Sequence, residues 1–164
     1  IEWVLGDLRS AGFAAAFDLV VMTGHAFQVL LEDDEIRDAL AAVRRALHRG
    51  GVFAFETRNP LARAFDRWTP DNATTLAGPD GATVTITTEV VGPYDGRTVS
   101  FTHTFAGAHP SLPQTSRSTL RFLHADELRG LLGAAGFSIL RQHGDFDGAP
   151  LTPSSPEIIT FAAK

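Results

Sequence analysis

The sequence predicts an α/β fold built on a mostly parallel sheet, with an inserted antiparallel β-hairpin or sheet, and three observations support this class. Strand and helix patterns alternate up to about residue 60. The same alternation returns after residue 122, and residues 61–122 between them are rich in β-branched and aromatic side chains. The 164 residues are 44% hydrophobic and 20% charged, which suits one globular domain with a hydrophobic core. We therefore expect a single domain over 1–164, with 61–122 as a β-rich lid or dimerisation subregion.

The N-terminal stretch has the pattern of strands separated by a helix. Residues 1–5 have a strand pattern, and residues 17–22 form an apolar run of the kind found in parallel strands buried on both faces. Apolar side chains then recur at helical spacing, and paired glycines at 50–51 end that helix. Residues 52–56 form the next buried strand, so we expect a right-handed parallel crossover.

The middle stretch changes to a β pattern. Residues 83–91 and 98–105 are rich in β-branched and aromatic side chains, and they flank the turn sequence Gly-Pro-Tyr-Asp-Gly. This combination predicts an antiparallel hairpin. A third β-rich run at 116–122 is a candidate to join the hairpin.

The last stretch returns to alternating helix and strand. A helix is expected to begin at Ala125 or Asp126 and to end at Gly136, with apolar side chains along one side. Residues 137–142 and 158–162 have the pattern of two closing strands. Prolines in the loop between these strands exclude a further helix there.

Composition argues against several classes of function. The formal charge of -5, without a run of Lys or Arg, offers no surface for a phosphate backbone, so we expect no nucleic-acid partner. The longest apolar stretches are far shorter than the roughly 20 residues that span a bilayer, so no membrane segment is expected. With no signal-peptide pattern and no cysteine, the default compartment is the cytoplasm. The six histidines are scattered without ligand spacing, so no metal site is predicted.

Three motifs resemble, in order, the second half of the Rossmann-like, class I S-adenosylmethionine-dependent methyltransferases. Val-Leu-Gly-Asp-Leu at 4–8 is similar to the end of the family's third strand, and residues 17–27 are similar to its fourth strand and the loop beyond. Residues 47–55 resemble its turn from helix to fifth strand, with Arg49 where the family usually has proline. The resemblance covers nearly the whole chain except parts of the insertion. It implies S-adenosyl-L-methionine as cofactor and a last strand that runs antiparallel.

The resemblance also implies where the cofactor binds. Asp7 would accept a hydrogen bond from the adenine amine, and the backbone amide of Leu8 would bind a ring nitrogen. Thr23, Gly24 and His25 would lie under the sulfonium, at the carboxyl end of a parallel strand, where open α/β sheets bind ligands. Gly24 would permit close approach of the cofactor to the backbone. The alternative for Asp7 is an ordinary aspartate at a strand end or turn.

Three residues are candidates for catalysis. Methyl transfer from a sulfonium needs alignment, a dry pocket and, for a hydroxyl acceptor, a base. His25 is the candidate base, because imidazole changes its charge near neutral pH. Arg58 and Asn59 leave the next strand at the same edge of the sheet and are candidates for the wall of the acceptor site. The alternatives are a polar loop histidine, a surface salt bridge for Arg58, and a turn residue before Pro60 for Asn59.

The family's first strand, its Gly-x-Gly-x-Gly loop and its acidic ribose ligand precede the part that this sequence resembles. We therefore expect an N-terminally truncated domain with weakened cofactor binding. In the family the first two strands lie between the third and the fourth. Residues 1–5 must therefore pair beside 19–22, exchange with another copy, or stay loose. An uncovered strand edge predicts a homodimer or a rearranged sheet edge.

The parent protein is accordingly expected to be an enzyme that transfers a methyl group from S-adenosylmethionine to a small-molecule substrate. A second hypothesis is a non-catalytic binding or dimerisation module that retains the methyltransferase scaffold. A third is one half of a nucleotide-dependent oxidoreductase. Cofactor affinity and the presence of a glycine-rich loop distinguish these hypotheses.

Overall fold

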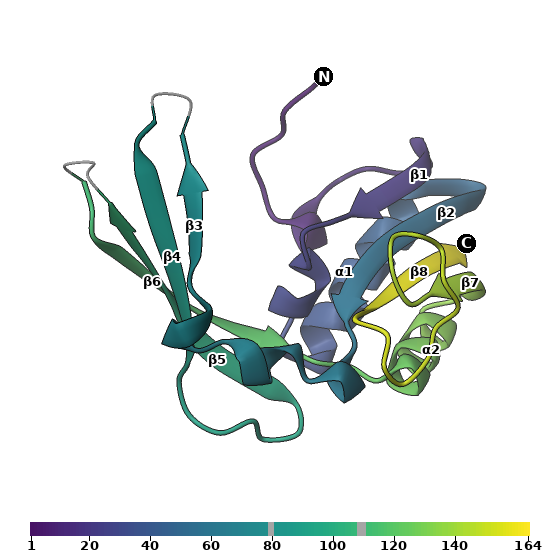
Figure 1. Ribbon diagram of the computed structural model, residues 1–164. Helices are drawn as coiled ribbons and strands as arrows, with labels where there is room; N and C mark the ends of the chain where they lie inside the picture. The colour runs from purple at the N-terminus through teal and green to yellow at the C-terminus, as the bar shows by residue number, and fades with distance from the viewer. Residues whose placement is uncertain (79–80, 108–110) are drawn as a thin grey trace. The chain divides into compact units, whose positions relative to one another are not determined.

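The computed structural model describes residues 1–78, 81–107 and 111–164, so positions 79–80 and 108–110 of the predicted insertion lie outside the described residues. The chain divides into two compact units (Figure 1). The first unit comprises Ile1–Ala62 together with Leu123–Lys164, and the second comprises Arg63–Phe122. The role of 61–122 as a lid or dimerisation subregion stays a prediction.

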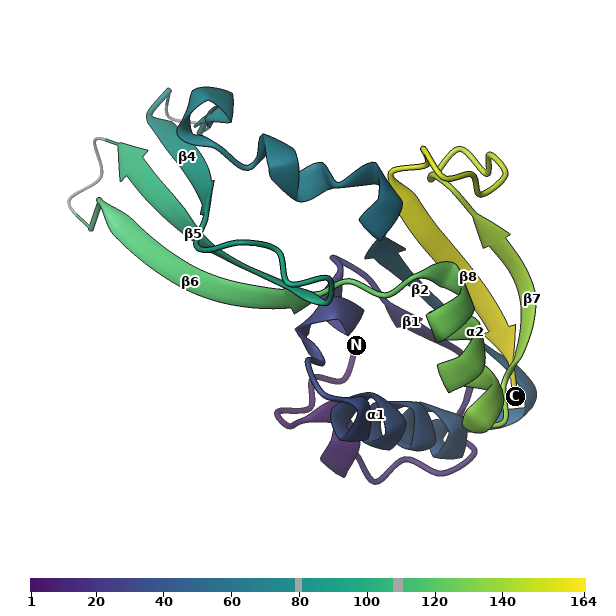
Figure 2. The same ribbon diagram turned by 90° about the horizontal axis from the view of Figure 1, so that it is seen from below.

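The first unit is built on a four-stranded sheet with the order β1-β2-β8-β7 (Figure 2). Its strands are β1 (Phe17–Met22), β2 (Leu47–Arg58), β7 (Ser138–His143) and β8 (Glu157–Ala163). β1 pairs with β2 in parallel, whereas β8 lies between β2 and β7 and runs antiparallel to both. The predicted α/β class is confirmed. The prediction of a mostly parallel sheet is not confirmed, because only one of these three strand pairs is parallel.

Two helices, α1 (Asp33–Ala46) and α2 (Ala125–Ala134), pack on one face of this sheet. In each helix a first-turn glutamate accepts the N–H of the N-cap residue: Glu35 from Glu32 at 3.2 Å, and Glu127 from His124 at 2.7 Å. The apolar sides of both helices join β2 in one buried cluster, which includes Ile36, Leu40, Val43, Phe53, Phe55, Leu128 and Leu132. Among the described residues, no helix is long and apolar enough to cross a membrane.

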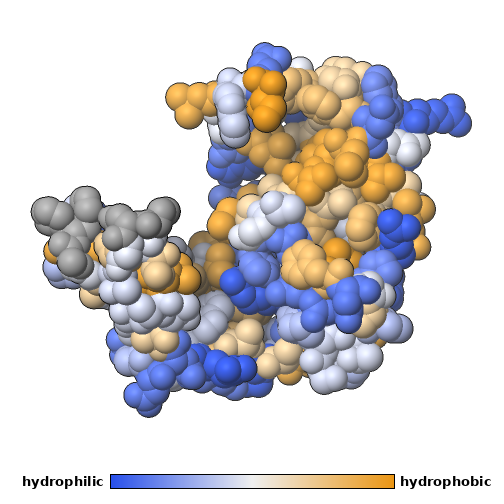
Figure 3. All heavy atoms as spheres, turned by 45° about the horizontal axis from the view of Figure 1, so that its top comes forward, coloured by the Kyte–Doolittle hydropathy of each residue, from blue (hydrophilic) through white to orange (hydrophobic). Residues whose placement is uncertain are grey.

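The opposite face of the sheet carries exposed apolar side chains on β1. Val20 and Met22 pack against the core cluster, so strand alternation directs Leu19 and Val21 to the other side. These two side chains are 54% and 53% exposed. Figure 3 shows apolar residues gathered on the surface of the molecule. An exposed apolar face favours association with another surface.

The prediction of a strand at residues 1–5 is wrong. This segment is irregular and exposed, and no strand in the described part of the chain pairs with it. A strand needs a neighbour for its N–H and C=O groups, and among the described residues β1 pairs with β2 alone. Residues 1–5 therefore do not pair beside residues 19–22, and their exchange with another copy stays a prediction.

The second unit contains a four-stranded antiparallel sheet with the order β3-β4-β5-β6. Its strands are β3 (Thr74–Ala77), β4 (Thr83–Val90), β5 (Thr98–Gly107) and β6 (Gln114–Arg121). The expected hairpin corresponds to β4 and β5, and the third β-rich run corresponds to β6. β3 was not predicted, because its four residues, all exposed, do not alternate between apolar and polar side chains. Phe65, Phe101 and Phe122 belong to the small core cluster of this unit.

We expect Leu128→Ala to lower the free energy of unfolding by about 2–5 kcal/mol, because Leu128 of α2 is fully buried and its truncation leaves a cavity. Leu140→Ala is the matched control: it removes the same atoms from a side chain that is 58% exposed, and a loss of about 0.5 kcal/mol or less is expected. Urea denaturation followed by circular dichroism measures both values. Equal losses in the two variants would contradict the packing of α2 on the sheet.

Candidate functional site

The parallel pairing of β1 with β2 brings the carboxyl ends of both strands to one edge of the first unit's sheet. β8 runs in the opposite direction, so it begins at this edge, where Glu157 stands opposite Arg58 in the strand register. The loop after β1, the end of β2 and the start of β8 therefore meet. His25, Glu56, Arg58 and Glu157 define the candidate site.

The loop after β1 turns at two successive residues with left-handed backbone. Thr23 and Gly24 follow the strand and are exposed, and φ is 70° at Gly24 and 58° at His25. This conformation is uncommon and strained for histidine. Glu56, only 4% exposed, stabilises the turn because its Oε1 accepts the backbone N–H of His25 at 2.9 Å. The bond ties the loop to β2.

The imidazole of His25 bonds to the start of β8. Its Nε2 lies 3.1 Å from both carboxylate oxygens of Glu157. The side chains of His25 and Glu157 are 23% and 14% exposed, so the pair is partly shielded from water. Across 1–78, 81–107 and 111–164, Nδ1 of His25 has no hydrogen-bond partner. An imidazole held in this way can take a proton from a hydroxyl or an amine.

Arg58 adds a partly buried positive charge to the site. Burial lowers the pKa of its guanidinium, while the negative charges of Glu157 and Glu56 act in the opposite direction. The backbone N–H and Nη1 of Arg58 both donate to Oε1 of Gln28, each at 3.2 Å. Gln28 is itself buried in the short 3-10 helix after His25. The site thus combines two carboxylates, one guanidinium and one imidazole.

Asn59, predicted to line the acceptor site, bonds to the loop before β8. Its Nδ2 donates to the carbonyl oxygens of Thr152 and Ser155 at 3.2 and 2.9 Å. Its Oδ1 accepts the N–H of Leu61 at 3.1 Å. Asn59 is buried, and both ends of its amide are engaged. These contacts favour a structural role for Asn59, and the catalytic role stays a prediction.

Asp7, predicted to bind adenine, caps a short 3-10 helix (Leu8–Ser10) and does not end a strand. Its carboxylate accepts hydrogen bonds from the backbone N–H and the guanidinium of Arg9 at 2.8 to 3.0 Å. These bonds lower the pKa of Asp7 from 3.8 to about 2. Within the described segments, no hydrogen bond joins Asp7 or Leu8 to residues 23–25. The adenine role of Asp7 and Leu8 stays a prediction.

Glu157 and Gln28 belong to the site but were not predicted from the sequence. Glu157 lies 132 positions after His25 in the chain. The expected antiparallel direction of the last strand could have revealed Glu157. An antiparallel strand begins at the edge where its parallel neighbours end, so its first residues lie near the site. Gln28 carries no comparable signal, since only the tertiary structure shows that it is buried beside Arg58.

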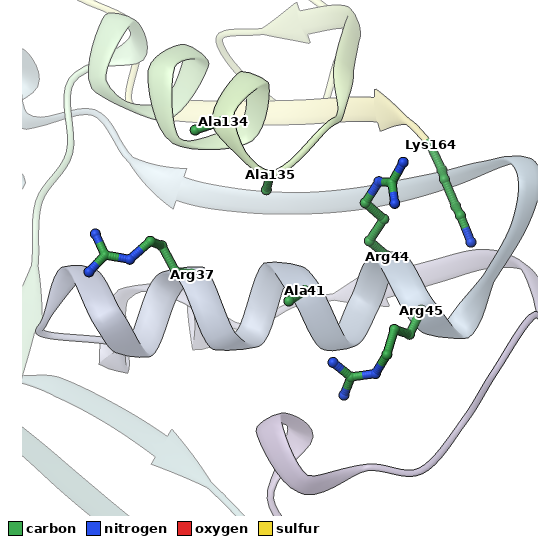
Figure 4. A pocket seen from close by; sticks show the side chains of 7 residues that line it. All are labelled: Arg37, Ala41, Arg44, Arg45, Ala134, Ala135 and Lys164. Carbon is green, nitrogen blue, oxygen red and sulfur yellow. The ribbon is translucent and has the colours of Figure 1, made fainter.

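A separate hollow of about 560 Å³ lies between α1 and α2 (Figure 4). Its charged lining consists of cationic side chains, namely Arg37, Arg44, Arg45 and Lys164. Arg37 pairs with Asp34, while Arg44 and Lys164 donate to the backbone carbonyls of Gly136 and Leu47. No imidazole or carboxylate is found among the described residues that line this hollow. In the part of the chain that the structure describes, no group of three or more His, Asp or Glu is placed to hold a metal ion.

No protein-family model and no curated protein sequence matches this chain, whereas many solved structures do. It is similar to an S-adenosylmethionine-dependent methyltransferase from Clostridium acetobutylicum ATCC 824, with a TM-score of 0.77 and 15% identity over 98% of this chain and 63% of that one. It is similar to the CcbJ methyltransferase from Streptomyces caelestis, with a TM-score of 0.75 and 22% identity over 97% and 62% of the two chains. It also matches CalS10, an amino pentose methyltransferase from Micromonospora echinaspora, with a TM-score of 0.68 and 19% identity over 96% and 62%.

The chain therefore has the fold of the S-adenosylmethionine-dependent methyltransferases, as the sequence motifs predicted. The matches cover nearly all of its residues, including the mixed sheet on which the candidate site lies. The chain spans about 62–63% of the length of the structures it matches.

Asn59→Ala is expected to lower the free energy of unfolding by about 1–3 kcal/mol, because the loop carbonyls lose their buried donor. Hydrogen exchange at residues 152–155, measured by mass spectrometry, is expected to accelerate. Asn72→Ala is the control, since Asn72 is an exposed asparagine that bonds the carbonyl of Arg67, and its loss costs about 0.5 kcal/mol or less. Unchanged exchange at 152–155 in Asn59→Ala would rule out the structural role.

The pairing of Asp7 with Arg9 predicts a pH dependence. Because the pKa of Asp7 is lowered, the pair contributes to stability above the unfolded carboxyl's pKa, and this contribution is lost as pH falls through about 2. We expect the ¹³C signal of the Asp7 carboxyl to remain that of the ionised form down to about pH 3. Arg9→Ala should move the titration upward. A midpoint near 3.8 in the unsubstituted protein would show that the pair does not form.

Proposed function

We propose that the protein transfers a methyl group from S-adenosylmethionine to a small-molecule acceptor. The observation that carries this proposal is the turn at Gly24 and His25, where two left-handed residues follow a parallel strand and Glu56 holds the second of them. The match to methyltransferase structures supports the same reaction. The matched structures include an amino pentose methyltransferase and a sugar N-methyltransferase, which supports an acceptor of small-molecule size.

The exposed turn is suited to the cofactor. A Cβ added to Gly24 would meet no atom within 4 Å, so a ligand can approach the bare backbone there. We assign Thr23, Gly24 and His25 to the sulfonium end, and Asp7 and Leu8 to the adenine. Asp7 fits this role because its side chain is 51% exposed and carboxylate oxygens can accept more than one hydrogen bond each. When bound, S-adenosylmethionine supplies an electrophilic methyl group on a positively charged sulfur.

The remaining residues of the site act on the acceptor. His25 removes a proton from the acceptor as the acceptor's lone pair attacks the methyl carbon. Arg58, held by Gln28, places a positive charge beside the acceptor and orients a polar group on it. Asn59 supports the wall of the site through the loop before β8. Alignment of the acceptor by this wall supplies much of the rate enhancement.

A second candidate is a non-catalytic binding or dimerisation module that keeps the methyltransferase scaffold. The exposure of Leu19 and Val21 on the open face of β1 favours it. This candidate predicts no affinity for S-adenosylhomocysteine. It also predicts concentration-dependent assembly in sedimentation experiments.

We expect isothermal titration to show that the full-length product of the gene binds S-adenosylhomocysteine. Gly24→Ala should weaken this binding at least about tenfold, or about 1.4 kcal/mol, because the added methyl group enters the space assigned to the cofactor. Gly50→Ala is the matched control and should leave the affinity unchanged. Gly50 also has a positive φ and open surroundings, but it lies at the opposite end of β2. Both substitutions should cost about 1 kcal/mol of stability through left-handed backbone strain.

The two failures of this experiment are distinct. No binding by the unsubstituted protein would refute the methyltransferase proposal, and assembly at the same concentrations would favour the second candidate. Equal loss of affinity in both glycine variants would refute only the placement of the cofactor at Gly24.

A further inference from the structure

We infer that Glu157 is the positioning residue of the site: it holds the proton of His25 on Nε2, and so presents an unprotonated Nδ1 to the methyl acceptor. The acceptor is then one that loses a proton from nitrogen or oxygen when it is methylated. The part that Nδ1 plays in the reaction rests on the proposed function. The position of the proton on the imidazole ring follows from contacts between described residues.

The hydrogen bond between the two side chains assigns the proton of the ring. Nε2 of His25 lies 3.1 Å from Oε1 and 3.1 Å from Oε2 of Glu157. An ionised carboxylate only accepts hydrogen bonds, so Nε2 must be the donor. In a neutral imidazole one nitrogen donates and the other accepts, and Nδ1 is therefore the acceptor.

Two carboxylates hold two different parts of His25. Glu56 accepts the backbone N–H at 2.9 Å and stabilises the left-handed turn, while Glu157 binds the ring. Glu56 lies on β2 and Glu157 on β8, and these strands are neighbours in the sheet. Glu157 pairs in register with Arg58. His25 is thus held at its backbone N–H and at Nε2 of its ring by groups that do not belong to its own loop. Fixed orientation is what a general base needs, because misplacement of a catalytic group lowers the rate steeply.

The proposed proton transfer is balanced within this set of groups. A lone pair on the acceptor's nitrogen or oxygen forms the new bond to the methyl carbon. The carbon–sulfur bond breaks, and its electron pair goes to the sulfur, which becomes neutral. The acceptor's proton passes to Nδ1 of His25 and produces an imidazolium. The carboxylates of Glu157 and Glu56 stabilise this cation, whereas the nearby Arg58 opposes it.

A purely structural contact is the competing interpretation. In that case the bond between His25 and Glu157 would only fasten the loop to β8, and Nδ1 would not react with an electrophile. The ring is 23% exposed, so a small alkylating reagent can test this point directly.

Alkylation by iodoacetamide identifies the reactive nitrogen, because only an unprotonated imidazole nitrogen attacks the reagent. We expect the full-length protein at about pH 8 to be modified at Nδ1 of His25. Digestion, mass spectrometry and comparison with the two alkylhistidine standards give the isomer. In Glu157→Gln, the ratio of Nδ1 to Nε2 product should fall at least about tenfold, because the bond to a charged acceptor is lost.

His143 provides an internal reference in the same sample. Its Nδ1 lies 2.9 Å from the carbonyl oxygen of Gly148, which can only accept, so His143 should give the Nε2 product in both proteins. Glu127→Gln serves as the control variant, since Glu127 is a carboxylate of the same unit that caps α2 by accepting the N–H of His124. It should leave the ratio at His25 unchanged.

The outcomes separate the inference from the proposed function. Modification of the unsubstituted protein at Nε2 of His25, or no modification of His25 where His143 reacts, would overturn the role of Glu157 without any variant that might fail to fold. An unchanged isomer ratio in folded Glu157→Gln would overturn it as well. S-adenosylhomocysteine should slow the alkylation of His25 but not of His143. The absence of this protection would count against the proposed function and leave the assignment of the ring proton intact.

Discussion

Parallel pairing between β1 and β2 places the turn after one strand beside the end of the other, and the candidate site depends on this pairing. β8 reaches the same edge for the opposite reason, because an antiparallel strand begins where its parallel neighbours end. Three segments that are distant in sequence thereby contribute His25, Arg58 and Glu157 to one place. The two helices pack on one face of these strands through the buried cluster, so the site rests on the hydrophobic core of the unit.

At this edge one hydrogen bond stabilises both a buried carboxylate and a strained backbone turn. A buried carboxylate such as Glu56 is costly unless it is hydrogen-bonded, and a left-handed histidine costs on the order of 1–3 kcal/mol. The single bond from the backbone N–H of His25 to Glu56 meets both needs. Glu157 likewise lies between His25 and Arg58, so its charge is balanced whether or not the ring carries a second proton. Such a set of groups is suited to proton transfer because no member is left without a partner charge.

Much of the fold was predictable because local patterns carry it. Helical spacing indicated α1, and apolar runs indicated β1 and β2. The expected helix end at Gly50 and Gly51 is wrong, because α1 ends at Ala46 and both glycines lie within β2. The expectation failed at residues 1–5, where an apolar pattern has no pairing partner, and at β3, where pairing exists without an apolar pattern. Both failures have one cause. A strand forms only where another strand pairs with it, and its own residues do not show whether such a partner is present.

Local sequence patterns were enough to predict the α/β class, the two helices, and the likeness to methyltransferases at the ends of successive strands. They also singled out His25 and Arg58, because residues at the carboxyl ends of adjacent parallel strands must lie near each other. Three contacts became visible in the folded chain alone: Asn59 bonds to a loop, Asp7 bonds to Arg9, and Glu157 bonds to the imidazole. These contacts depend on strand register and on the approach of residues up to 132 positions apart, which no local pattern encodes.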